Sequence, residues 1–287
     1  MNRAIKLILP ALILVIVILL PTNPNTENKN QKTEAEQIIL EAHSALALNL
    51  LTNKILFEKN IYEPLPLASL SKIISSLVVA DHIDLNEYIE ITKNAVQTPE
   101  PSTLLVGEHL RAEDLLAMAM GESSNDAMMA LVEHFGNKEW PATSSVEWFL
   151  ELINKKAFEL GTEKMSFLNP TGLDIENETF PSNFGSAWDL AQIVKNSIDS
   201  PIWQLGEKKE VISREGIAHK IHHTNLLRNE ISGINGAKTG FTDSAGGNLI
   251  LIVEKPLGAP KLIIILGSSL EGRFLDAKKL FTTLAVL

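Results

Sequence analysis

The sequence predicts an α+β fold in which strands from both ends of the chain share one sheet and helices occupy the middle. Short runs typical of strands occur at residues 44–58 and again after residue 209, whereas helical periodicity dominates residues 67–200. Hydrophobic residues make up 45% of the 287-residue chain and charged residues 21%. This composition is typical of a chain that buries a sizeable core.

The N-terminal segment differs from the rest of the chain. Arg3 and Lys6 precede an apolar run over residues 7–20, which is shorter than the roughly 20 residues of a typical spanning helix. Because no small-x-small cleavage pattern follows, we expect residues 1–22 to be a retained membrane anchor with its positive end in the cytoplasm. A cleaved export signal is the alternative. The polar residues 23–37 are predicted to be a solvated linker.

The folded domain is predicted over residues 38–287, beginning with a hairpin. Its two strands, Ser44–Leu51 and Lys54–Glu58, flank the turn residues Thr52 and Asn53. The later elements are expected as helical segments within 111–135 and at 144–160, strands at 248–254 and 261–266, and a last helix at 273–287.

Composition excludes several function classes. The chain has no cysteine, which rules out disulfides, thiolate metal sites and a cysteine nucleophile. Its formal net charge of -10 and its lack of a long basic run argue against nucleic-acid binding. His219, His222 and His223 form an H-x-x-H-H pattern, but no matching carboxylate motif accompanies them, so we expect neither a metal nor another cofactor.

Ser69 and Lys72 form the first chemically suggestive pair. They stand three residues apart at the start of an apolar run over residues 73–80, and in a helix this spacing places both side chains on one face. A lysine desolvated by apolar neighbours has a lowered pKa and can take the proton of a serine hydroxyl. Taken alone, the pattern is more typical of a capping serine followed by a surface lysine.

Two further motifs strengthen the catalytic interpretation. Ser123 and Asn125 lie where residues 121–126 interrupt two apolar helical segments, so they can project from a loop into a cleft. Lys238-Thr239-Gly240 precedes an apolar β-like run, which suits an extended anionic substrate laid along a sheet edge. Each motif alone has an ordinary structural explanation, but the three occur together and in this order.

With these motifs the chain resembles the low-molecular-mass D-alanyl-D-alanine carboxypeptidases, serine DD-peptidases of the penicillin-binding protein superfamily. That superfamily has the set S-x-x-K, S-D-N and K-T-G, and the middle motif here is S-S-N. The resemblance also covers the stretches PLASLSK (66–72), GEHLRAEDLL (107–116), FLNPTGL (167–173) and KTGFTDSAG (238–246). It implies a β-lactamase-like fold, with an antiparallel sheet flanked by helices and a mostly helical insert.

The resemblance implies a role for each residue of these motifs. Ser69 would be the nucleophile that forms an acyl-enzyme, Lys72 its base, and Ser123 a relay of the proton to the leaving amine. The residues implied to bind the substrate are Asn125, Lys238, Thr239, Gly240, Phe241 and Arg273. The backbone N–H groups of Ser69 and Phe241 would form the oxyanion hole. Many relatives have histidine where Phe241 and Thr171 stand here.

The resemblance further implies peptidoglycan stem peptides as substrates and β-lactam antibiotics as covalent inhibitors. The domain would be exported, facing the periplasm or cell wall as an anchored protein, or secreted after cleavage. We expect the additional β-rich domain of many carboxypeptidases to be missing after the last helix, and single-domain relatives include DD-endopeptidases, so cleavage of cross-links is the main alternative. A β-lactamase or a non-catalytic wall-binding module are weaker alternatives.

Overall fold

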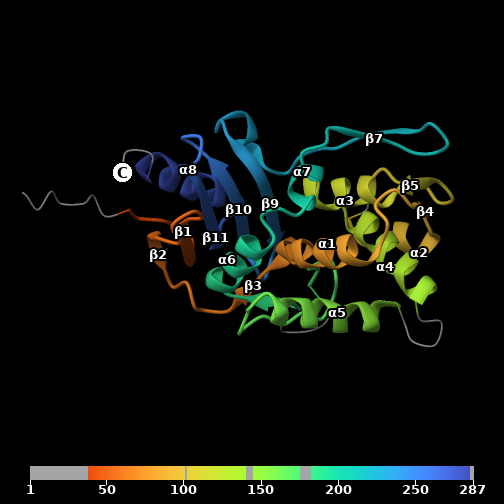
Figure 1. Ribbon diagram of the computed structural model, residues 1–287, viewed down its shortest axis with the longest axis horizontal. Helices are drawn as coiled ribbons and strands as arrows, with labels where there is room; N and C mark the ends of the chain where they lie inside the picture. Colours follow the sequence, from red (N-terminus) through yellow and green to blue (C-terminus); the bar gives the residue numbers. More distant parts are fainter. Residues whose placement is uncertain (1–37, 101, 140–144, 175–181, 285–287) are drawn as a thin grey trace, which may run out of the picture. The chain divides into compact units, whose positions relative to one another are not determined.

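A computed structural model describes residues 38–100, 102–139, 145–174 and 182–284 (Figure 1). Residues Ile38–Leu287 constitute one compact unit. The predicted anchor and linker, residues 1–37, lie outside the described residues. Among the helices that are described, none is both long and apolar enough to cross a membrane.

The main sheet has five antiparallel strands in the order β2-β1-β11-β10-β9. Strands β1 (Ser44–Asn49) and β2 (Ile55–Lys59) form the predicted N-terminal hairpin. The remaining strands are β9 (Ile234–Thr242), β10 (Gly246–Glu254) and β11 (Pro260–Ser268). Because β1 pairs with β11, the two ends of the domain share one sheet, which confirms the prediction of an α+β fold with an antiparallel sheet.

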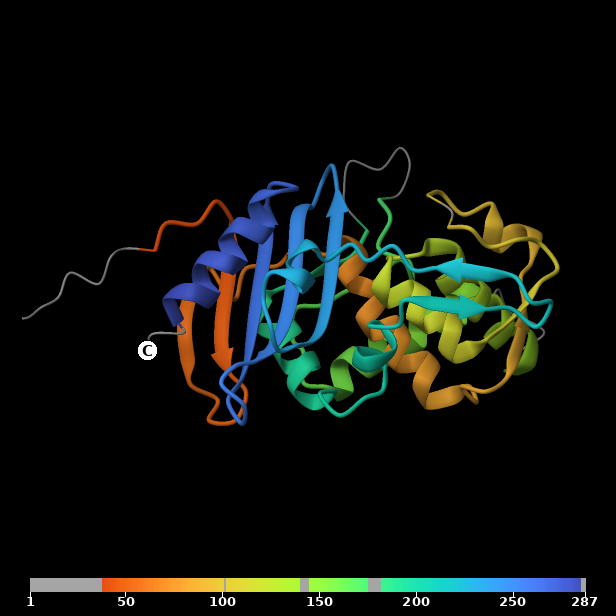
Figure 2. The same ribbon diagram turned by 90° about the horizontal axis from the view of Figure 1, so that it is seen from above.

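Helices form the rest of the domain and lie on both faces of the sheet, as Figure 2 shows. The α-helices are α1 (Ser71–His82), α2 (Lys93–Val96), α3 (Ala112–Gly121), α4 (Asn125–Glu139), α5 (Ser145–Glu159), α6 (Ala187–Asn196), α7 (Ile202–Leu205) and α8 (Gly272–Leu284). Two 3-10 helices occur at η1 (Ala68–Leu70) and η2 (Leu226–Asn229). Short two-stranded ribbons pair β3 (Leu65–Pro66) with β6 (Phe184–Gly185), β4 (Tyr88–Glu90) with β5 (His109–Arg111), and β7 (Glu210–Ile212) with β8 (Ala218–Lys220).

The central strands are apolar on both faces because the sheet separates two cores. Alternate residues of β10 point in opposite directions, so Ile250 joins the larger core with the helical region while Leu249 and Leu251 join the smaller one. Phe274 and Leu280 of α8 cover this second face. Burial on both faces explains why β10 and β11 are continuous apolar runs without alternation.

Helix α1 runs through the larger core and carries the first motif. Its residues from Ser71 to Val79 are all buried, including the polar Lys72, Ser75 and Ser76. Ser75 Oγ donates a hydrogen bond to the carbonyl of Pro170 (2.7 Å), which attaches the loop over residues 169–174 to α1. Ser75 and Lys72, which also donates to the carbonyl of Thr171, therefore fix a neighbouring loop instead of facing solvent.

Gly172 fits tightly against the turn that presents Ser69. Its φ is +87°, and a Cβ placed on it would lie 1.9 Å from the carbonyl oxygen of Ala68 and 2.9 Å from the Ser69 nitrogen. Ala68 itself has a φ of +47°, which is uncommon for a residue with a side chain. The loop and the turn before α1 can pack this closely only because residue 172 lacks a side chain.

We therefore expect Gly172→Ala to lower the free energy of unfolding by at least about 3 kcal/mol, since it combines a left-handed backbone with a backbone clash. Urea unfolding followed by circular dichroism measures this. Gly161→Ala is the matched control, because Gly161 has a φ of +83° but open space around its Cβ position, so it should lose only about 1 kcal/mol. Equal losses in the two variants would contradict the tight packing inferred at Gly172.

Candidate active site

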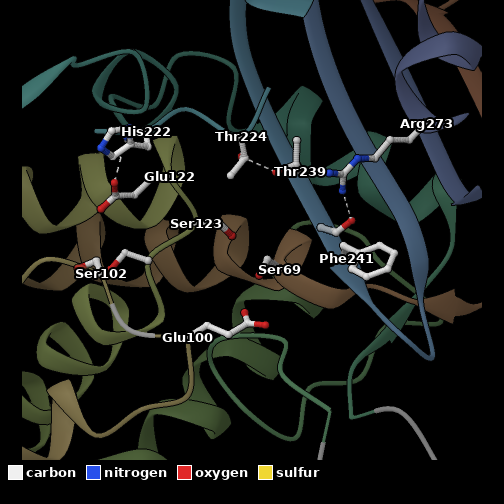
Figure 3. A pocket seen from close by; sticks show the side chains of 12 residues that line it. Ser69, Glu100, Ser102, Glu122, Ser123, His222, Thr224, Thr239, Phe241 and Arg273 are labelled. Carbon is white, nitrogen blue, oxygen red and sulfur yellow. Dashed lines mark hydrogen bonds between the residues drawn. The ribbon is translucent and has the colours of Figure 1, made fainter. Parts of the chain in front are cut away.

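A pocket of about 360 Å³ opens where η1, the α3–α4 loop and β9 meet (Figure 3). Its lining contains Ser69, Ser123, Thr239, Gly240, Phe241 and Arg273, all expected from the sequence, together with Glu100, Ser102, Glu122, Ser124, His222 and Thr224. The three motifs, far apart in the sequence, therefore meet at one cavity. Lys72, Asn125 and Lys238 lie directly behind its wall, as the hydrogen bonds below show.

Ser69 and Lys72 are joined at the N-terminal end of α1. Lys72 Nζ lies 2.8 Å from Ser69 Oγ and also donates to Asn125 Oδ1 (2.6 Å) and to the carbonyl of Thr171 (2.8 Å). The i, i+3 spacing places both side chains on one face, although Ser69 itself belongs to η1 and the α-helix begins at Ser71. Lys72 thus has three oxygen partners and points at the serine hydroxyl.

Burial changes the acidity of Lys72. Its side chain has no exposed surface, and this desolvation lowers the pKa of its ammonium group from 10.5 to about 7. The negative charges of Glu100 and Asp126 act in the opposite direction and raise the pKa, but their effect is smaller. Near neutral pH a large fraction of Lys72 is consequently uncharged. In that form its nitrogen can accept the Ser69 proton instead of donating to the hydroxyl.

A second lysine–serine contact lies across the pocket. Lys238 of β9 donates hydrogen bonds to Ser123 Oγ (2.8 Å) and to the carbonyl of Thr239 (2.7 Å). Burial, followed by the nearby charges of Lys72 and Arg273, lowers the pKa of Lys238 well below 10.5. Ser123 has a φ of +68° in the three-residue break between α3 and α4, and this unusual backbone directs the hydroxyl into the pocket.

Asn125 begins α4 and is held from both sides. Its carbonyl oxygen accepts from Lys72, and its Nδ2 donates to the carbonyl of Pro99 (3.0 Å). Ser124 caps the helix by accepting from the Ala127 N–H (3.0 Å). The side chain of Asn125 therefore connects Lys72 to the loop that carries Glu100.

Asp126 is a buried positioning group that the sequence reasoning missed. It has no exposed surface and accepts hydrogen bonds from the backbone N–H (2.8 Å) and hydroxyl (3.0 Å) of Ser102. It also accepts from the hydroxyl of Ser124. Asp126 thus joins the loop at Ser102 to the start of α4. An aspartate after the S-x-N motif is a common residue at a helix N-terminus, so nothing in the sequence distinguished it.

Strand β9 forms the opposite wall. Thr239 Oγ1 lies 2.5 Å from Thr224 Oγ1, and Arg273 Nη1 donates to the carbonyl of Gly240 (2.7 Å), as Figure 3 shows. A Cβ on Gly240 would lie 2.9 Å from the Leu67 carbonyl oxygen, so glycine is needed for β9 to approach the turn that carries Ser69. The side chain of Phe241 is 43% exposed at the rim.

Arg273 and Asn248 strengthen this wall. Arg273 is buried at the first turn of α8, and its desolvation lowers the pKa of the guanidinium to about 10. Asn248, absent from the sequence-based site, donates to the carbonyls of Pro66 (2.9 Å) and Leu67 (3.1 Å). It therefore ties β10 to the segment that leads into Ser69. A lone asparagine inside an apolar strand was the available clue, because a buried amide requires partners.

The H-x-x-H-H histidines do not converge. His219 is buried between Thr103 Oγ1 (2.8 Å) and Glu108 Oε2 (3.0 Å), whereas His222 lines the pocket. In the described part of the chain, no group of three or more histidine, aspartate or glutamate side chains has a metal-binding arrangement. His219 instead ties strand β8 to the loop before β5.

Comparison with known proteins agrees with this geometry. The profile of a family described as D-alanyl-D-alanine carboxypeptidase matches residues 29–266. The chain is 29% identical to the carboxypeptidase DacF of Bacillus subtilis over 81% of its own length and 59% of the relative's. It is 28% identical to a D-alanyl-D-alanine endopeptidase of Escherichia coli, over 94% of this chain and 86% of the relative.

Solved structures share the fold. Penicillin-binding protein D2 of Listeria monocytogenes, in its ampicillin-bound form, superimposes with a TM-score of 0.71 at 25% identity, covering 86% of this chain and 98% of the other. A Streptomyces K15 DD-transpeptidase variant gives a TM-score of 0.77 at 23% identity, covering 87% and 99%. These neighbours confirm the predicted fold class, that of the DD-peptidases.

The lowered pKa of Lys72 predicts a pH dependence for acylation of Ser69. Because only uncharged Lys72 can accept a proton, the rate of acylation by benzylpenicillin should rise with pH, with a midpoint near 7. Stopped-flow measurements between pH 5.5 and 9 test this, with circular dichroism at each pH confirming that the protein stays folded. A rate that stays low at pH 7 and still rises steeply between pH 8 and 9 would show that Lys72 keeps an ordinary pKa.

Proposed function

Because this chain belongs to the D-alanyl-D-alanine carboxypeptidase family, we propose that it is a serine-type D-Ala-D-Ala carboxypeptidase that trims peptidoglycan stem peptides. One observation carries the proposal: the buried Lys72 lies 2.8 Å from the Ser69 hydroxyl and has a pKa near 7. A nucleophile within hydrogen-bond reach of a base that is partly uncharged at neutral pH is what acyl transfer requires.

Acylation begins with Ser69. Lys72 accepts the hydroxyl proton while Ser69 Oγ attacks the carbonyl carbon of the penultimate D-alanine. The negative charge that develops on the carbonyl oxygen is stabilised by the backbone N–H groups of Ser69 and Phe241. Collapse of this intermediate breaks the peptide bond, releases the terminal D-alanine and leaves an ester on Ser69, which water then hydrolyses.

The other pocket residues supply the leaving-group proton and the binding contacts. Ser123, held 2.8 Å from Lys238 Nζ, passes a proton to the departing amine. Asn125 holds the peptide backbone on the acyl-donor side. Thr239 and the positively charged Arg273, both in the pocket lining, receive the terminal carboxylate, and Lys238 supports this wall from behind.

Cleavage of cross-links is a second candidate. The Escherichia coli endopeptidase aligns with 94% of this chain and over 86% of its own length, whereas the Bacillus subtilis carboxypeptidase aligns over 59% of its length. The family description names the carboxypeptidase, and a relative named as an endopeptidase matches nearly the whole of this chain, so both activities are candidates. Both reactions use the same acyl-enzyme and differ only in the leaving group.

The proposed substrate places the catalytic domain outside the cytoplasmic membrane. We accordingly propose that the chain is exported and that residues 1–22 are retained as the anchor. The ampicillin-bound form of the Listeria monocytogenes relative supports β-lactams as covalent inhibitors of this chain too. The anchor rests only on the apolar run after Arg3 and Lys6.

Ser69→Ala should abolish covalent labelling by a fluorescent penicillin, because no other hydroxyl in the pocket contacts Lys72. Gel fluorescence after denaturation measures the labelling. Ser76→Ala is the control, since Ser76 lies on the following helix α1 and its buried hydroxyl has no hydrogen-bond partner among the described residues; this variant should keep full labelling. Persistent labelling of the Ser69→Ala variant would contradict the proposed role of Ser69 as the nucleophile.

Product analysis separates the two candidate activities. The protein is incubated with pentapeptide monomers and with cross-linked dimers, and the products are identified by mass spectrometry. Release of D-alanine from monomers at the higher kcat/KM is the expected result. Conversion of dimers to monomers with little release of D-alanine would establish the endopeptidase, and no product from either substrate would contradict both.

A further inference from the structure

The pocket is electrically asymmetric around its nucleophile. Arg273 lies at the β9 and α8 side of the pocket, with Lys238 buried behind the same wall. Glu100, on the loop between α2 and β5, lies on the other side of Ser69, as Figure 3 shows. The positive side suits the terminal carboxylate of a peptide. The proposed function assigns no partner to the negative side.

The loop that carries Glu100 is fixed beside the acyl-donor part of the cleft. Asn125 Nδ2 donates to the carbonyl of Pro99 (3.0 Å), the residue immediately before Glu100. Since Asn125 is proposed to hold the peptide backbone preceding the scissile bond, Glu100 adjoins the same part of the substrate. Its φ of +57° is uncommon for a residue with a side chain.

The carboxylate of Glu100 is exposed and available. Within the described residues, no hydrogen bond or ion pair engages it, although Glu122, the other glutamate of the pocket lining, accepts from the His222 N–H (3.1 Å). The negative charge of Glu100 also acts on Lys72. Burial lowers the pKa of Lys72, and among the neighbouring charges Glu100 opposes this lowering most strongly. An unpaired carboxylate on a cleft wall attracts a cationic ligand group.

We propose that Glu100 is a specificity-determining residue that binds an ammonium group carried by the acyl-donor part of the peptide substrate. This proposal rests on the proposed function. The preferred substrate then carries a carboxylate at one end and a side-chain amine before the penultimate residue. Acylating that amine removes its charge, so Glu100 favours peptides whose side-chain amine has not yet been linked to another peptide.

Two synthetic peptides test this preference. Nα-acetyl-L-Lys-D-Ala-D-Ala carries a free side-chain amine, and the diacetylated peptide differs by one acetyl group on that amine, which removes its charge. We expect kcat/KM to be about three- to fivefold higher for the charged peptide, the size of effect typical of a solvent-accessible ion pair. Glu100→Gln should bring the ratio close to one, and 1 M NaCl should reduce the wild-type ratio by screening.

Glu90→Gln is the matched control, because Glu90 is exposed on β4 and lies outside the pocket lining. This variant should keep the wild-type ratio between the two peptides. Equal use of both peptides by the wild type, or the same ratio in wild type and Glu100→Gln, would overturn the role of Glu100 while leaving the proposed function standing.

A pair of penicillins separates failure of this inference from failure of the proposed function. Ampicillin differs from benzylpenicillin by one amino group on the acyl side chain, and acylation does not depend on peptide turnover. The ratio of their acylation rates should fall in Glu100→Gln relative to wild type. Cleavage of neither peptide would contradict the proposed function, whereas an unaltered penicillin ratio in Glu100→Gln would contradict the ammonium site.

Discussion

The placement of one lysine ammonium in an apolar core is the constraint on which the rest of the structure depends. Lys72 has no exposed surface, and a buried charge is expensive unless it is paired or lost. Here the lysine has three oxygen partners, from Ser69, Asn125 and Thr171, and the nearest carboxylates only partly offset its desolvation. The result is an amine that exchanges its proton near neutral pH.

Each neighbouring element is arranged around that group. Helix α1 is buried along nine consecutive residues and fixes the direction of the lysine side chain. Gly172 allows one loop to pack directly on the turn before Ser69, and Gly240 allows β9 to do so from the other side. Asn248 ties the central sheet to the same turn through two backbone carbonyls. A rigid shell of this kind holds Ser69 Oγ and Lys72 Nζ 2.8 Å apart before a substrate arrives.

Sequence reasoning predicted the fold class and the residues of the three motifs because both depend on local patterns. Apolar runs and the terminal hairpin located the strands, and the spacing of Ser69 and Lys72 placed them on one helical face. It missed Asp126, Thr224 and Asn248, because their importance arises from partners 24, 15 and about 180 residues away. The identity of a single polar residue does not indicate which distant residue it contacts. Nor did the sequence indicate a role for Glu100, because that role depends on the position of its loop beside Asn125.

The central claim is that a large fraction of Lys72 is uncharged in the folded protein near neutral pH. Nuclear magnetic resonance of protein with 13C-labelled lysine side chains tests it directly, with Lys72→Arg used to assign the resonance. We expect the Lys72 Cε shift to titrate with a midpoint near 7. A midpoint close to 10.5, the ordinary value for a lysine side chain, would contradict the account.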